Sequence, residues 1–158
     1  MSLDEFNQSI AASPLPAWLR AALNLHQHHA RFDLGFWPAL IRFVARRQII
    51  GLGGSRLVVA YDPDTVAKIA ICTAGIAANA TEARLSAQYG DTTDIATGVH
   101  YASCHLVPSA GLGKVLLMER ITPWELSIHG EAPEWAAFVD NQQIGYTKSG
   151  RLAAYDFG

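Results

Sequence analysis

Three charged residues stand where the local sequence predicts a strand, a helix and the end of a hairpin. Lys68 lies in the apolar run TVAKIA, where a buried ammonium group would need an anionic partner. Glu82 lies on the next predicted helix, from which it could pair with this lysine. Asp156 follows a predicted hairpin and offers the oxygen ligand that Mg²⁺ takes. Brought together, they would form a site for a nucleotide phosphate, whereas taken singly they resemble a snorkelling lysine and two solvated acids.

A glycine-rich turn, Gly51-Leu52-Gly53-Gly54, precedes the lysine strand. It does not fit the dinucleotide-binding fingerprint, because Arg56 occupies the third glycine position and a strand follows instead of a helix. It does not fit the P-loop either, since no Gly-Lys-Ser/Thr follows it. Two interpretations remain: a flexible turn before a strand, or a turn whose backbone amides approach phosphates.

The other residue types that bind metals are scattered. His26 and His29 would share one helix face and could hold a metal with Asp33, but a solvated helix end is the simpler interpretation. Cys72 and Cys104 do not have the spacing of a zinc site. We interpret them as reduced thiols of a cytoplasmic protein.

The elements that must position these groups are short helices and strands. Apolar spacing and turn residues predict helices over 3–12, 17–29, 34–47, 76–89 and 133–140. They predict strands over 56–61, 65–70, 99–107 and 114–119, and a hairpin over 143–155. This order indicates an α+β fold with helices packed on an antiparallel sheet.

Composition narrows the possible functions. The chain has 158 residues, of which 50% are hydrophobic, and this is enough for one domain with a sizeable core. Its formal net charge of −2 gives no general attraction to nucleic acid or to an anionic membrane surface. No apolar stretch of about 18 residues could span a membrane, and no signal peptide is evident. We therefore expect a cytoplasmic protein that binds neither nucleic acid nor membrane.

The order of motifs from residue 47 onwards resembles the protein-kinase-like fold. The segment IGLGGSRLV at 50–58 is similar to the glycine-rich loop between the first two strands. Val66-Ala67-Lys68 is similar to the third-strand lysine motif, although it is one residue shorter than usual. Glu82 matches the helix glutamate that pairs with that lysine.

The resemblance continues in the C-terminal third of the chain. The segment VLLMERI at 115–121 is similar to the fifth strand and hinge, with Met118 at the gatekeeper position. The hairpin at 145–152 and the following Asp156-Phe157-Gly158 resemble the segment that carries the metal-binding triplet. This hairpin and triplet are the most specific match.

The resemblance implies a site for ATP and Mg²⁺. The residues implied to bind the nucleotide are Gly51, Gly53, Gly54, Ser55, Lys68, Glu82, Met118, Glu119 and Ile121, and those implied to hold the metal are Asp156 and Gln143. The single domain 1–158 would comprise a helical N-terminal extension (1–47), a small lobe with an antiparallel sheet and one main helix (48–121), and a reduced large-lobe remnant (122–158).

The chain departs from the kinase pattern at its catalytic loop. Kinases carry an Asp that orients the substrate hydroxyl, and an Asn five residues later that binds the second Mg²⁺. Aligned on the hairpin, these positions hold Phe138 and Gln143. Asp140 is the nearby candidate for a substitute base. We therefore expect a pseudokinase with impaired catalysis, and the alternative is an active ATP-dependent phosphotransferase that uses Asp140.

An impaired kinase would act by binding another protein. A truncated large lobe should leave apolar surface exposed, for which Trp124, Trp135, Phe138 and Phe157 are candidates. We expect a homodimer or a host-protein partner that the chain modulates or inhibits. Small kinase-like proteins of this kind are often encoded by bacteriophages, which would place the chain in the host cytoplasm. A third hypothesis is a structural domain whose kinase-like residues are coincidental.

Overall fold

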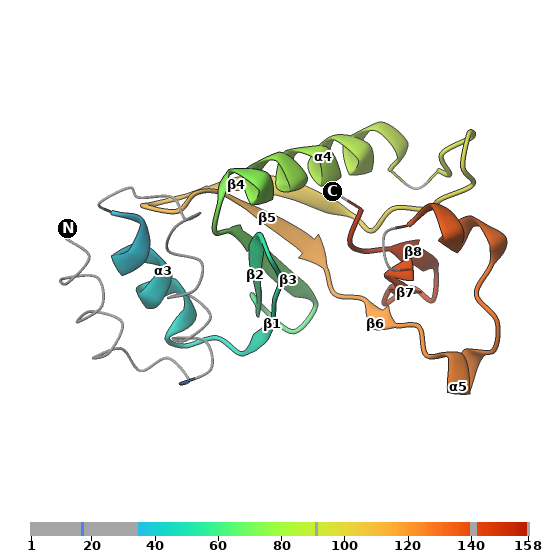
Figure 1. Ribbon diagram of the computed structural model, residues 1–158, viewed down its shortest axis with the longest axis horizontal. Coiled ribbons are helices and arrows are strands. Elements are labelled where there is room, and N and C mark those ends of the chain that lie inside the picture. Colours follow the sequence, from blue (N-terminus) through green and yellow to red (C-terminus); the bar gives the residue numbers. More distant parts are fainter. Residues whose placement is uncertain (1–16, 18–34, 91, 140–141, 158) are drawn as a thin grey trace.

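The largest element of the fold is a five-stranded antiparallel sheet with the strand order β1-β2-β3-β5-β4 (Figure 1). The computed structural model describes Ala17 and residues 35–90, 92–139 and 142–157. The strands are β1 (Ile49–Leu52), β2 (Arg56–Ala60), β3 (Thr65–Ala70), β4 (Cys104–Ser109) and β5 (Gly113–Glu119). The α+β class and the antiparallel sheet agree with the sequence prediction.

Strand β3 lies at the centre of this sheet and has the bounds that were predicted from the sequence. Because successive side chains of a strand point to opposite faces, Ala67 and Ile69 enter one core, whereas Val66 and Lys68 face the other side. The turn before β3 is stabilised by Asp62, whose carboxylate accepts a hydrogen bond from the Asp64 amide at 2.9 Å. The segment Asp62-Pro63-Asp64 thus forms the turn between β2 and β3, the two strands that the sequence predicted on either side of it.

Helix α3 (Phe36–Val44) covers the first of these two faces. Phe36, Leu40 and Val44 recur every four residues, so they form one stripe on the helix. The stripe packs on Leu57 and Ile69 of the sheet, and all five side chains are buried. This helix confirms the one predicted over 34–47, with shorter ends, while the predictions over 3–12 and 17–29 fall outside the described residues except at Ala17.

Helix α4 (Thr73–Tyr89) lies across the opposite face and contacts β3, β4 and β5 (Figure 1). Its buried residues are Gly75, Asn79, Glu82 and Ser86, which lie on one face of the helix but are small or polar. The sequence predicted a helix over 76–89 with a loop before it, and that start was wrong. The helix begins earlier because Gly75, which has no side chain, packs against the backbone of Ser55 in the β1–β2 turn.

A second, three-stranded sheet follows β5 and has the order β6-β7-β8. It consists of β6 (Thr122–Pro123), β7 (Ile144–Tyr146) and β8 (Leu152–Ala154), and the hairpin β7–β8 confirms the prediction over 143–155. Thr122 and Pro123, which lie in no strand predicted from the sequence, pair with β7. Helix α5 (Leu126–His129) and a 3₁₀ helix (Glu134–Phe138) lie between β6 and β7.

The segment before β4 links the two sheets. A strand was predicted over 99–107, but β4 starts only at Cys104. The reason is that Tyr101 makes a parallel bridge to Ala154, and the Ala102 amide donates to the Ala154 carbonyl at 2.8 Å. In the part of the chain that the structure describes, no helix has the length and apolar character needed to cross a bilayer.

Candidate functional site

Lys68 and Glu82 form an ion pair in the interior of the molecule. The Lys68 ammonium Nζ donates to Glu82 Oε2 at 2.8 Å, and the two residues are only 4% and 0% exposed. Strand β3 directs the lysine toward α4, and the buried face of α4 carries the glutamate. Asn79, one turn earlier on the same face, donates from Nδ2 to the Lys68 carbonyl at 3.0 Å, which ties the helix to the strand.

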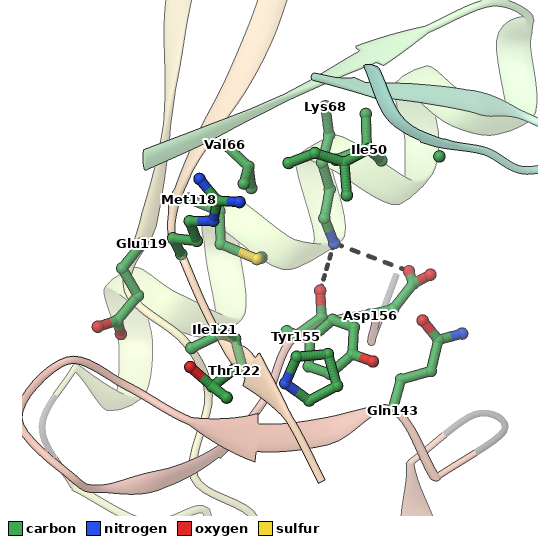
Figure 2. A pocket seen from close by; sticks show the side chains of 14 residues that line it. Ile50, Val66, Lys68, Met118, Glu119, Ile121, Thr122, Gln143, Tyr155 and Asp156 are labelled. Atoms are coloured by element: carbon green, nitrogen blue, oxygen red, sulfur yellow. Dashed lines mark hydrogen bonds and ion pairs between the residues drawn. The ribbon is translucent and has the colours of Figure 1, made fainter. Parts of the chain in front are cut away.

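Asp156 lies close to this ion pair, on the segment that follows β8. Its Oδ1 is 3.8 Å from Lys68 Nζ, and Lys68 also donates to the main-chain carbonyl of Tyr155 (Figure 2). The structure therefore brings together the lysine, the helix glutamate and the hairpin aspartate that the sequence singled out. Asp156 is the most accessible of the three, with a side chain that is 33% exposed.

Arg56 is a fourth charged member of the cluster, and the sequence analysis did not find it. Its Nη1 donates to Glu82 Oε1 at 2.6 Å, and its Nη2 donates to Asp156 Oδ1. Arg56 is opposite Ala70 in the β2–β3 ladder, just as Val58 is opposite Lys68, so both cations point to the same face. Strand alternation could have placed Arg56 and Val58 on one face, but it could not have shown that Glu82 and Asp156 meet Arg56 there.

The four charges balance one another. Arg56 and Lys68 are cations, Glu82 and Asp156 are carboxylates, and buried ions persist in proteins when they are paired in this way. Burial lowers the pKa of the Lys68 ammonium, and the nearby Arg56 charge lowers it further, while Glu82 and Asp156 act in the opposite direction.

A cavity of about 450 Å³ lies between the two sheets, and Lys68 and Asp156 stand at one side of it (Figure 2). Val58, Val66 and Met118 provide apolar walls from β2, β3 and β5. The remaining lining residues are Ile50, Gly51, Glu119, Arg120, Ile121, Thr122, Pro123, Gln143 and Tyr155. This volume and this mixture of apolar walls with a few charged groups are typical of small-molecule sites.

Most of the predicted site residues line this cavity. Those that do are Gly51, Lys68, Met118, Glu119, Ile121, Gln143 and Asp156. Glu82 is not among the lining residues, but it pairs with Lys68, which is. The candidate base Asp140 falls outside the described residues. The sequence analysis missed the apolar lining residues Ile50, Val58 and Val66, because apolar strand residues carry no signal that separates a cavity wall from a core.

The predicted glycine-turn residues Gly53, Gly54 and Ser55 are absent from the lining. The Gly53 amide donates to the Arg56 carbonyl at 2.9 Å, which closes the turn on itself. The Ser55 carbonyl accepts from the Ile71 amide at 2.9 Å, so the turn lies against the start of α4. In this arrangement these three residues do not face the cavity.

No protein-family model matches the sequence, and no curated protein matches it significantly. The chemistry of the cavity is therefore inferred from its own residues. These supply an apolar compartment, the cations Lys68 and Arg120, the carboxylates Glu119 and Asp156, and the neutral amide of Gln143.

The two cysteines should differ strongly in their reactivity. Cys104 is 6% exposed on β4, and burial raises the pKa of its thiol to about 12, whereas Cys72 is partly exposed at the start of α4. Because the thiolate is the reacting form, Cys104 stays protonated at pH 8 and should react slowly. Titration of the folded protein with a chromogenic disulfide should show one fast thiol, lost in Cys72→Ser, and both thiols should react after denaturation. Equal rates in the folded protein would contradict this environment for Cys104.

Proposed function

We propose that this chain is a kinase-like protein that binds an adenine nucleotide, has impaired phosphotransfer, and acts by binding and modulating a protein partner. The observation that supports nucleotide binding most directly is the Lys68–Glu82 ion pair at the edge of an apolar cavity. A glutamate that fixes a lysine beside a cavity gives the ammonium a defined position for a phosphate group. The apolar walls at Val58, Val66 and Met118 would accept a purine ring.

Impaired phosphotransfer is supported by the residue at the expected base position. Phe138 ends the 3₁₀ helix, is 68% exposed, and is absent from the residues that line the cavity. A phenyl ring cannot accept a proton, so this position offers no general base. Gln143 does line the cavity, but its side chain is a neutral amide.

A protein partner is supported by exposed apolar side chains around the second sheet. Leu126 and Ile128 on α5 are each 70% exposed, and Phe138 is nearly as exposed. The sequence analysis also expected Trp124, Trp135 and Phe157 at the surface. These three side chains are half-buried instead of exposed, because they pack on the core of the second sheet. The proposed partner would be a second copy of the chain or a host protein.

Nucleotide binding is tested by the melting temperature in the presence of ATP, measured once with excess EDTA and once with Mg²⁺. A ligand that binds only the folded state at about 100 times its Kd adds about 2.7 kcal/mol of stability. For a chain of this size we expect a rise of roughly 5–11 °C in at least one condition. This proposal fails if millimolar ATP leaves the melting temperature unchanged in both.

Two lysine variants localise the effect. Lys68→Ala should abolish the ATP-dependent rise, because it removes the cation at the edge of the cavity. Lys148→Ala is the matched control: this lysine pairs with Asp64 at 2.6 Å but its side chain is 77% exposed, so ATP binding should be unaffected. An ATP-dependent rise that survives in Lys68→Ala would place the nucleotide elsewhere.

Phosphotransfer is tested separately with radiolabelled ATP and a generic protein substrate. We expect no transfer above background from the wild-type chain. Transfer that is lost in Asp140→Asn would instead favour the active phosphotransferase that the sequence left as an alternative.

A further inference from the structure

The divalent metal implied by the kinase resemblance does not fit the side chains at the charged side of the cavity. Mg²⁺ requires near-octahedral oxygen coordination, usually with one or two carboxylates. The implied ligands are Asp156 and Gln143. Asp156 Oδ1 already accepts a hydrogen bond from Arg56 Nη2 and lies 3.8 Å from Lys68 Nζ, while Gln143 offers only a neutral amide oxygen.

Arg56 is a permanent counter-ion for Asp156. A guanidinium group stays protonated in proteins, and its pairs with carboxylates are among the stronger hydrogen bonds. Arg56 is itself held in place by Glu82 at 2.6 Å and by Asn79 Oδ1 at 3.5 Å, and the residue is 7% exposed. The guanidinium is therefore fixed against Asp156 before any ligand arrives.

Charge, rather than access, disfavours the metal. The Asp156 side chain is 33% exposed, so an ion from solvent can reach it. However, the two carboxylates are matched by two cations, so the cluster has no surplus negative charge to attract Mg²⁺. A metal ion would bind a carboxylate that Arg56 and Lys68 already neutralise, and the positive charges of these two side chains would repel it.

We propose that Arg56 replaces the metal as the counter-ion of Asp156, so that the cavity binds the phosphate chain of a nucleotide in its metal-free form. This inference rests on the proposed nucleotide binding. Lys68 lines the cavity and meets the phosphates directly. Arg56 is not among the lining residues, so it acts as a positioning residue through Asp156.

Calorimetric titration of the wild-type chain with ATP tests this inference in two buffers, one with excess EDTA and one with excess Mg²⁺. We expect binding in EDTA to be at least as tight as binding in Mg²⁺, because the metal gains no ligand from the protein. Binding that is about tenfold or more tighter with Mg²⁺ would overturn the inference and leave the proposed nucleotide binding intact. No heat of binding in either buffer would overturn both.

Replacing Arg56 tests whether this residue is the cause. Arg56→Gln releases Asp156, so ATP binding should become about tenfold or more tighter with Mg²⁺ than with EDTA. Arg84→Gln is the matched control, because Arg84 is exposed on α4, where its Nη1 donates to Gln88 Oε1 at 3.2 Å. If Arg56→Gln binds ATP equally tightly with Mg²⁺ and with EDTA, the role assigned to Arg56 is overturned.

A direct metal measurement keeps the inference testable if Arg56→Gln does not fold. Mn²⁺ in solution gives an electron paramagnetic resonance signal that falls when the ion binds protein. Wild-type chain without nucleotide should leave this signal unchanged up to millimolar protein. A loss of signal that is abolished by Asp156→Asn would show a metal on Asp156 and overturn the inference.

Discussion

Replacing Glu82 with leucine is expected to lower the free energy of unfolding by about 3–5 kcal/mol. Glu82 is fully buried and is the carboxylate that both Arg56 and Lys68 contact, at 2.6 and 2.8 Å. Without it, two buried cations share the partly exposed Asp156. The loss is measured by urea denaturation followed by circular dichroism.

A second substitution should restore part of this stability. In Glu82→Leu, the further change Lys68→Met removes one of the cations left without its partner, so the double variant should be more stable than Glu82→Leu alone. Glu131→Leu is the control, because this acid is exposed and its loss should change stability by less than about 0.5 kcal/mol. If Glu82→Leu is as stable as Glu131→Leu, the charged cluster does not exist as described.

Leu40→Ala is expected to lower the free energy of unfolding by about 2–5 kcal/mol. Leu40 is 0% exposed at the centre of the α3 stripe, where it packs between this helix and the sheet. The truncation removes buried apolar surface and leaves a cavity that the rigid sheet cannot close. A fall in melting temperature of roughly 4–20 °C should follow.

Arg42→Ala is the matched control for this second change. Arg42 lies on the exposed side of α3, two residues after Leu40, and alanine is a good helix former. Its melting temperature should stay close to that of the wild type. If Leu40→Ala melts at the same temperature as Arg42→Ala, α3 does not contribute to the core of the sheet.

Local sequence was sufficient to predict the elements that have a clear hydrophobic periodicity or clear turn residues. Strand β3 was predicted with its full bounds, because TVAKIA alternates between the two faces and follows an Asp-Pro-Asp turn. The hairpin β7–β8 followed from the Lys148-Ser149-Gly150 turn between two short apolar runs. This alternation also places Lys68 on the same face as Val66, and the structure shows that α4 lies on that face.

Helix α4 shows an element whose start the local hydrophobic pattern could not predict. Its buried face is formed by Gly75, Asn79, Glu82 and Ser86, which have the spacing of one helix face but none of the hydrophobicity. Specific hydrogen-bond partners offset the cost of burying these polar side chains. For example, the Ser86 hydroxyl accepts a hydrogen bond from the Cys104 amide at 2.9 Å. Those partners belong to other elements, so the helix start could not be read from its own residues.

The sequence by itself determined the α+β class, the central strand and the residue types that could form a charged site. Only the tertiary structure decided that Arg56 joins this site, because its partners Glu82 and Asp156 are 26 and 100 residues away along the chain. The periodicity of a strand determines which face a side chain occupies, but not which charge from a distant element meets it there. The packing of α4 and of the segment after β8 against one sheet face supplies that information, and with it the counter-ion of Asp156.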